Sequence, residues 1–309
     1  MSKINQAPVL FPGARVPDRQ RTVDSSGLRL AVYEWGDASA PPVLLAHGGF
    51  DFARTFDVFA PLLADGGYRV VSWDHRGHGN SEHADLYSWE ADERDLLAVA
   101  NSVSPGPFPV VGHSKGGGLF AHIIQALPHR FSRFASIDGL PFRQNLPDVA
   151  NKERTIKLKD KAAKFLDDRR RSHDMTRRPG TVAELATRRA PMNPRLTDEW
   201  LQYIVYSGGY EAEDGWRWKI DPSLRMGGFG PWRSRWVTDR LPGFPIPLLA
   251  LFGTESEPMG WGVDPEAIKK YMPSHAQVEI LEGVGHFLHI EKPTLTAELV
   301  LNFLGREGA

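Results

Sequence analysis

The feature that most constrains the fold is a sharp turn between a predicted strand and a predicted helix. Residues 112–116 read G-H-S-K-G, directly after a short apolar run at 107–111. A helical pattern follows, in which Leu119 and Ile123 lie on one apolar face. The glycines two positions before and after Ser114 let neighbouring backbone pass closely, because they carry no Cβ. The pattern predicts a strained turn that raises the Ser114 hydroxyl above the end of a sheet, where it is a candidate nucleophile.

The order of the predicted elements indicates the fold class. Strands alternate with helices over residues 21–141 and again over 239–309, which predicts a mostly parallel α/β sheet with helices on both faces. Residues 142–238 break this alternation, because they carry many charges, several helical segments and no convincing strand. We therefore expect a helical insertion after the strand that ends at Asp138. Residues 1–20 contain three prolines and little periodicity, so an extended arm is expected there.

Composition excludes several classes of function. The chain has 37 basic and 38 acidic side chains, a balance that gives no field to attract nucleic acid or an anionic membrane. It has no cysteine, so disulfides, thiolate metal sites and cysteine nucleophiles are excluded. No stretch approaches the roughly 18 apolar residues of a membrane span, and residues 1–6 do not read as a signal peptide. These observations predict a cytoplasmic protein with no membrane span.

Three further motifs accompany the Ser114 turn. Residues 47–50 read H-G-G-F, residues 74–81 read D-H-R-G-H-G-N-S, and residues 285–287 read G-H-F. In this order the set resembles the α/β-hydrolase superfamily, in the branch of esterases, haloperoxidases and epoxide hydrolases. Dehalogenases and epoxide hydrolases of this fold carry aspartate at the turn, whereas this chain has serine. The resemblance implies a serine hydrolase whose insertion at 142–238 forms a helical cap over the active site.

Roles for the site residues follow from the resemblance and from the chemistry. A serine hydroxyl needs a base to take its proton as it attacks, and His286 is the candidate, since imidazole exchanges protons near neutral pH. The tetrahedral intermediate needs two backbone donors. The N–H of Lys115 is the first donor, and the second is Gly49, with Phe50 as the near alternative. The Lys115 ammonium is expected to point into solvent or into a salt bridge.

Other histidines flank the motifs. We expect four of them to orient the loops at the strand ends through hydrogen bonds. These are His47, His75, His78 and His113. His289 is close enough to His286 that spacing alone does not exclude it as the base, but it lacks the flanking glycines.

The acid of the triad is the open member. The superfamily often places an aspartate three residues after the strand-end glycine, here Gly253, but this chain has serine at that position, flanked by Glu255 and Glu257. A second known placement is the end of the strand before the insertion, where Asp138 stands 24 residues beyond Ser114. We favour Asp138, then Glu257, then Glu255.

The sequence thus predicts a serine hydrolase that cleaves a carboxylic ester or lactone through an acyl-enzyme, with a small apolar ester-like substrate. No metal and no other cofactor is implied. A carbon–carbon bond hydrolase acting on a diketone and a non-enzymatic ligand-binding protein of this fold are the alternatives. Trp216 and Trp218 are expected to line an acyl pocket. The sequence does not indicate the oligomeric state.

Overall fold

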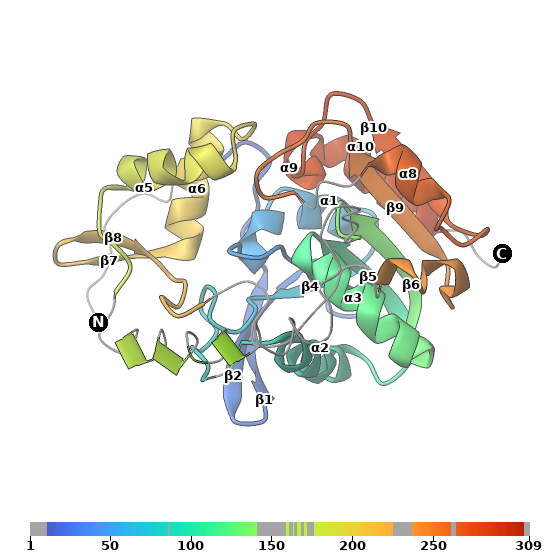
Figure 1. The fold of residues 1–309 in the computed structure, drawn as a ribbon, viewed down its shortest axis with the longest axis horizontal. Helices are drawn as coiled ribbons and strands as arrows, with labels where there is room; N and C mark the ends of the chain where they lie inside the picture. Colours follow the sequence, from blue (N-terminus) through green and yellow to red (C-terminus); the bar gives the residue numbers. More distant parts are fainter. Residues whose placement is uncertain are drawn as a thin grey trace.

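Figure 1 shows the computed structural model, in which a twisted sheet carries helices on both faces and a smaller group of elements lies beside it. The structure describes residues 11–85, 87–140, 176–224, 237–260 and 264–305, together with several positions between 159 and 171.

In this described part of the chain, eight strands form one sheet in the order β1-β2-β4-β3-β5-β6-β9-β10. The strands are β1 (Arg19–Ser25), β2 (Leu28–Trp35), β3 (Pro42–Ala46), β4 (Arg69–Trp73), β5 (Phe108–His113), β6 (Phe131–Ile137), β9 (Leu248–Gly253) and β10 (Gln277–Leu281). β2 is antiparallel to both of its neighbours, β1 and β4. The other neighbours are parallel. The predicted α/β class, with a mostly parallel sheet, is confirmed.

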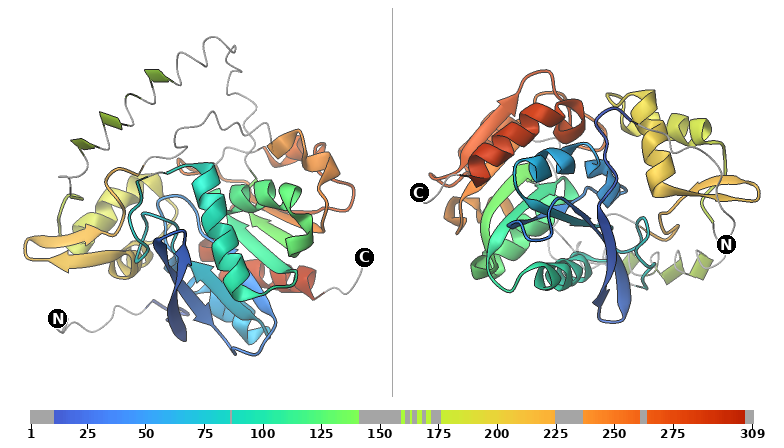
Figure 2. Two further views of the ribbon diagram at one scale, coloured as in Figure 1. Left: turned by 90° about the horizontal axis from the view of Figure 1, so that it is seen from below. Right: turned by 180° about the vertical axis from the view of Figure 1, so that it is seen from behind.

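The helices cover the two faces of the sheet (Figures 1 and 2). The α-helices associated with the sheet are α1 (Phe59–Asp65), α2 (Trp89–Val103), α3 (Lys115–Ala126), α8 (Pro265–Lys269), α9 (Leu288–Glu291) and α10 (Pro293–Leu304). Short 3-10 turns are η1 (Ala53–Phe56), η2 (Pro128–Arg130) and η4 (Leu241–Gly243). Residues of α2, α3 and α8 belong to one buried cluster, and residues of α1, α9 and α10 to the other. No helix among the described residues has the length and apolar character needed to cross a membrane.

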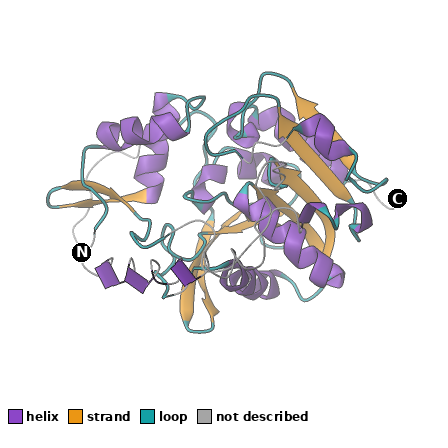
Figure 3. Cartoon of the chain, viewed as in Figure 1, coloured by secondary structure: helices purple, strands orange, loops and turns teal. Residues whose placement is uncertain are grey.

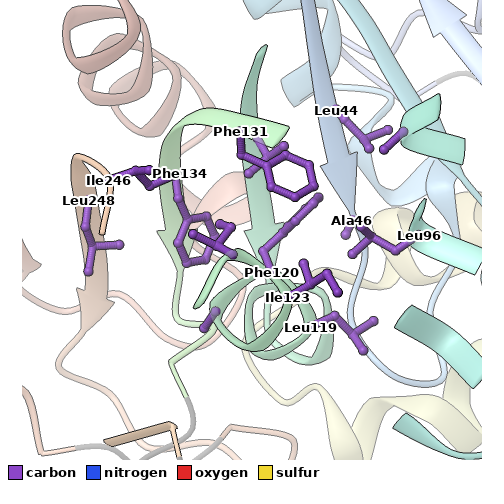
Figure 4. Packing of buried hydrophobic residues seen from close by; sticks show 14 of the residues in the cluster. Leu44, Ala46, Leu96, Leu119, Phe120, Ile123, Phe131, Phe134, Ile246 and Leu248 are labelled. Carbon is purple, nitrogen blue, oxygen red and sulfur yellow. The ribbon is translucent and has the colours of Figure 1, made fainter. Parts of the chain in front are cut away.

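The apolar run of β3 explains why both faces are covered. Leu44 and Ala46 point into the cluster under α2 and α3, whereas Val43 and Leu45 point into the cluster under α1 and α10. All four are fully buried. Because successive side chains of a strand point to opposite faces, only a strand packed on both sides reads as a continuous apolar run. Figure 4 shows the first cluster, where Phe120 of α3 lies against strand residues.

Two helices of the sheet layers begin at residues whose side chains cap them. The Ser88 side chain accepts the N–H of Ala91 at 3.2 Å and caps α2. Asp264 caps α8, with Pro265 as its first residue.

The described residues 176–224 of the insertion hold two α-helices, a 3-10 turn and a β-hairpin. They are α5 (Val182–Arg189), η3 (Ala190–Met192), α6 (Asp198–Gly208), β7 (Gly209–Ala212) and β8 (Gly215–Trp218). Figure 3 shows the hairpin beside the helices, apart from the main sheet. The prediction of no strand between 142 and 238 is therefore wrong. Each strand has only four residues, which is too short for an alternating pattern to stand out in the sequence.

Part of the predicted arm lies in the described residues. The ring of Phe11 meets Trp200 of α6 edge-on at 4.8 Å. The indole N–H of Trp35 on β2 donates to the Arg15 carbonyl at 3.0 Å. Residues 11–18 thus contact both the insertion and the sheet. The arm ends earlier than predicted, since β1 begins at Arg19.

Candidate active site

Strained backbone gathers at the carboxyl edge of the sheet. Among the described residues, four non-glycine residues have a positive φ. Ser26 lies in the hairpin turn between β1 and β2. The other three lie at the carboxyl ends of strands: Ser114 (φ 51°) directly follows β5, Asp138 (φ 41°) directly follows β6, and Phe50 (φ 57°) lies in the loop after β3. Such conformations cost about 1–3 kcal/mol each and persist where the surroundings hold them. Their clustering marks this edge as the candidate functional site.

Ser114 forms the turn between β5 and α3, as predicted. A Cβ at Gly112 would lie 2.5 Å from the Cα of Gly117, and a Cβ at Gly116 would lie 2.2 Å from the Ala46 carbonyl oxygen. Strand and helix therefore approach more closely than any side chain allows. The Ser114 side chain does not cap α3, so the hydroxyl is left for another partner.

His286 follows β10 and is held by Asp138, which follows β6. The Asp138 carboxylate contacts Nδ1 of the His286 ring, and His286 is 2% exposed. Because a carboxylate only accepts, this contact assigns the ring proton to Nδ1 and leaves Nε2 as the basic nitrogen. His113, next to Ser114, donates from its own Nε2 to the His286 carbonyl at 3.0 Å. The main-chain N–H of Ser114 donates to the Ile137 carbonyl at 3.2 Å, which places Ser114 beside the end of β6, where Asp138 follows.

The two alternative acids lie elsewhere. Glu257 is buried and accepts the main-chain N–H of His286 at 2.5 Å, so it supports the loop and not the ring. Burial raises the pKa of the Glu257 carboxyl. Glu255 is exposed, near Arg195. Of the three predicted candidates, the structure brings only Asp138 to the imidazole.

His47 fixes the peptide that carries the Gly49 N–H. The Nδ1 of His47 donates to the Gly48 carbonyl at 2.7 Å, and its Nε2 accepts the main-chain N–H of His75 at 3.0 Å. In a trans peptide the carbonyl and the following N–H point in opposite directions, so the Gly49 N–H points away from the His47 ring. Gly48 lies against the turn at Ser114, where an added Cβ would be 3.2 Å from the Cβ of Ser114.

The N–H of Phe50 is already used. It donates to Nε2 of His78 at 3.1 Å, and Nδ1 of His78 donates to the Arg76 carbonyl at 2.9 Å. Of the two alternatives from the sequence, Gly49 is the one whose N–H makes no hydrogen bond within the described part of the chain.

The loop histidines are held in their neutral form. Burial is the main cause that lowers the pKa of His47, His75 and His113 well below the usual value. Burial likewise lowers the pKa of His78 to about 3. Neutral rings keep one acceptor nitrogen each, which the hydrogen bonds of His47 and His78 require. The bonds of His47 and His78 join the loops after β3 and β4, and His113 at the end of β5 bonds to the loop after β10, as the sequence predicted for these residues.

Lys115 uses its side chain away from the site. Its ammonium pairs with Asp92 of α2 at 2.7 Å, and both side chains are at most 10% exposed. A second buried pair joins Arg76, in the loop after β4, to Asp95 of the same helix at 2.6 Å. Of the two outcomes left open by the sequence, the salt bridge is the one found.

Trp216 and Trp218 of the insertion differ in the part of the protein that they contact. Trp216 packs with Leu185 and Leu201 inside the insertion. Trp218 stacks on Phe52 with ring centroids 5.8 Å apart and planes within 13°. Only Trp218 is thereby joined to the loop that follows β3.

Sequence reasoning missed two arginines of the insertion. Arg189 donates to the Phe50 carbonyl at 3.1 Å, and Arg195 donates to the Gly283 carbonyl. No motif or periodicity marks either residue in the sequence. Within the described residues, no three His, Asp or Glu side chains are grouped so as to hold a metal ion.

Comparison with known proteins identifies the family of this fold. Residues 41–293 match the family model described as the alpha/beta hydrolase fold. A serine hydrolase-like protein of Dictyostelium discoideum is 24% identical over 91% of this chain and 80% of its own length. The sn-1-specific diacylglycerol lipase ABHD11 of Mus musculus is 24% identical over 87% of this chain and 82% of its own length.

Solved structures show the same fold. A thioesterase domain from the curacin biosynthetic pathway has a TM-score of 0.77 at 24% identity, and the match covers 92% of this chain and 99% of that domain. At this identity the likeness speaks for the fold alone. Together with the family match over most of the chain, it shows that this protein belongs to the α/β-hydrolase family.

Proposed function

We propose that the protein is a serine hydrolase that cleaves a carboxylic ester or lactone through an acyl-enzyme. Ser114 is the nucleophile, His286 the general base and acid, and Asp138 the residue that orients the imidazole. The observation that carries the proposal is the contact of the Asp138 carboxylate with Nδ1 of His286, at the same sheet edge as the strained Ser114. In the neutral ring this contact places the proton on Nδ1, so that Nε2 is the nitrogen that takes the role of base.

The chemistry then follows from the positions of the donors. As Ser114 Oγ attacks the carbonyl carbon, Nε2 of His286 takes its proton, and the carbonyl oxygen becomes an oxyanion. The backbone N–H groups of Gly49 and Lys115 stabilise that charge. His286 then protonates the leaving alcohol, and water attacks the acyl-enzyme by the same steps in reverse. The mechanism requires a Ser114–His286 hydrogen bond in the substrate complex, where catalytic hydrogen bonds often tighten.

Two observations support an ester as the substrate class. The mouse relative is named for a lipase activity, and the Dictyostelium relative for likeness to serine hydrolases. We further propose that residues 142–238 act as a cap that shapes the acyl pocket. Trp218 supports this role, since it joins the insertion to Phe52 in the loop after β3.

Stopped-flow hydrolysis of p-nitrophenyl acetate tests the proposal. Where deacylation limits turnover, an acyl-enzyme predicts a burst of one p-nitrophenol per active site, and Ser114→Ala should abolish both the burst and the turnover. Ser207→Ala is the matched control, because its hydroxyl only bonds to carbonyls of its own helix. A folded protein that shows no burst but cleaves a 1,3-diketone would favour carbon–carbon bond hydrolysis. A protein that does neither would be a binding member of the family.

A further inference from the structure

The link between α5 and α6 touches both loops of the candidate site. Arg189 is the last residue of α5, and Arg195 lies six residues later, before α6. Arg189 reaches the loop after β3, which carries the Gly49 donor. Arg195 reaches the loop after β10, which carries His286. We call residues 189–195 the strap.

Arg189 holds the loop after β3 at its strained residue. Its Nη1 donates to the Phe50 carbonyl at 3.1 Å, and its Nη2 donates to the buried Asp51 carboxylate at 3.2 Å. Its Nε donates to Asn193, and its guanidinium lies 5.3 Å from the Trp218 ring centre. The side chain is only 13% exposed, so these contacts are shielded from water.

Phe50 is thereby fixed from two sides. Its N–H is held by His78 of the loop after β4, and its carbonyl by Arg189 of the insertion. A phenylalanine at φ 57° is strained and returns to a relaxed conformation when such contacts are lost. Relaxation at Phe50 reorients the adjoining Gly49. The direction of the proposed oxyanion donor therefore depends on Arg189.

Arg195 holds the loop after β10, which carries His286, in a similar way. It donates to the Gly283 carbonyl, and its Nε donates to Glu291 at 2.9 Å. The other oxygen of Glu291 accepts the N–H of Gly285 at 2.9 Å. The fit is tight, because a Cβ at Gly285 would lie 2.5 Å from the Arg195 Cδ.

We propose that the strap fixes the position of the oxyanion donor relative to the general base, with Arg189 and Arg195 as positioning residues. The proposal rests on the function proposed above for Ser114. It makes the insertion part of the catalytic geometry as well as a cover. Because the two arginines share one short segment, release of either one loosens the other.

Kinetics of Arg189→Ala tests the strap, with Arg188→Ala as the matched control. Arg188 is the neighbouring residue of α5 and donates to two carbonyls, those of Arg178 and Pro179, away from both loops. For p-nitrophenyl acetate, we expect Arg189→Ala to lower kcat about tenfold to a hundredfold, less than the full loss of an oxyanion donor. KM stays within about threefold, since the contact serves the transition state. Affinity for an aryl trifluoromethyl ketone, which forms an oxyanion on serine, falls by the same factor as kcat.

Further variants sharpen the result. Arg189→Lys keeps the charge and restores part of kcat, whereas Arg188→Ala remains near wild type. Arg195→Ala lowers kcat as well, and the double variant loses less than the product of the single losses. Losses that multiply would contradict a shared strap.

Hydrogen exchange separates failure of the strap from failure of the proposed function. Arg189→Ala should speed amide exchange in residues 48–52 and 283–286 by tenfold or more, and Arg188→Ala should not. Unchanged exchange in both loops overturns the strap, whatever the activity. A folded wild-type protein that neither hydrolyses p-nitrophenyl acetate nor is acylated by it overturns the function, whatever the exchange.

Discussion

His289 offers a way to measure how much a buried histidine without hydrogen-bond partners lowers the free energy of unfolding at acidic pH. It is fully buried on α9, against the rings of Phe56 and Phe59 at 5.1 and 6.1 Å. Neither ring nitrogen has a hydrogen-bond partner among the described residues. Burial, with a smaller contribution from His286, lowers the pKa of His289 to about 3. The ring is therefore neutral in the folded protein at any pH where the protein is ordinarily handled.

This pKa predicts how stability changes with pH. The unfolded chain has a histidine pKa of about 6.5, so between pH 6.5 and 3 it binds more protons than the folded protein. The free energy of unfolding is then unaffected above pH 6.5 and falls as the pH drops below it. Integrating proton binding from pH 7.5 to pH 5.0 gives a loss of about 2 kcal/mol from this one residue.

His289→Phe should remove that loss. We expect the free energy of unfolding of the variant, relative to wild type, to be about 2 kcal/mol higher at pH 5.0 than at pH 7.5, measured by urea denaturation. Any effect of the larger ring on packing cancels in this difference, because it is present at both pH values. His129→Phe, at an exposed histidine, is the control and should show no comparable change. Parallel pH curves for wild type and His289→Phe, within about 0.5 kcal/mol, would refute the reasoning.

Three other changes probe the site. Asp138→Asn should lower kcat for an aryl ester by about 10⁴-fold, because the imidazolium loses its charged partner. Glu257→Gln should lower kcat far less, since glutamine keeps an oxygen that accepts the main-chain N–H of His286. The reverse ranking would move the acid to the loop after β9. Trp218→Ala should change the ratio of kcat/KM between acetate and octanoate esters. Trp216→Ala should mainly lower the free energy of unfolding, by about 3–5 kcal/mol in thermal or urea unfolding. Equal changes of the kcat/KM ratio in both variants would contradict this distinction. Lys115→Met should cost about 3–5 kcal/mol in urea denaturation, because it leaves a buried carboxylate unpaired, and a smaller loss than 1 kcal/mol would mean that the ion pair contributes little.

The elements with strong local signals could be predicted from the sequence. The turn at Ser114 has glycines whose absence of Cβ the packing demands, and β3 is apolar throughout because both its faces are covered. The β7–β8 hairpin could not be predicted, since four-residue strands leave no periodicity. Residues 142–158 lie outside the described residues, so the start of the insertion stays a prediction.

The residue types of the site could be predicted from the sequence, but the choice between alternative residues for the acid and for the second oxyanion donor could not. Nothing local to Asp138 or Glu257 in the sequence says which carboxylate meets the imidazole, because that depends on where the loop after β10 crosses the sheet edge. The preference for Gly49 over Phe50 depends on His78, which is 28 residues away from Phe50 in the chain. Arg189 and Arg195 are ordinary charged residues of a helix end and a linker until the fold brings the loops to them.

Labelling with a fluorophosphonate tests the central proposal most directly, because the reagent phosphonylates only a serine that an adjacent base activates. Incubation of the whole protein, followed by intact mass measurement and peptide mapping, should show one phosphonyl group per chain, on Ser114. Ser114→Ala should take up none under the same conditions, and Asp138→Asn should react much more slowly. Labelling of a different residue, or no labelling of the folded wild-type protein, would contradict the assignment of Ser114 as the nucleophile.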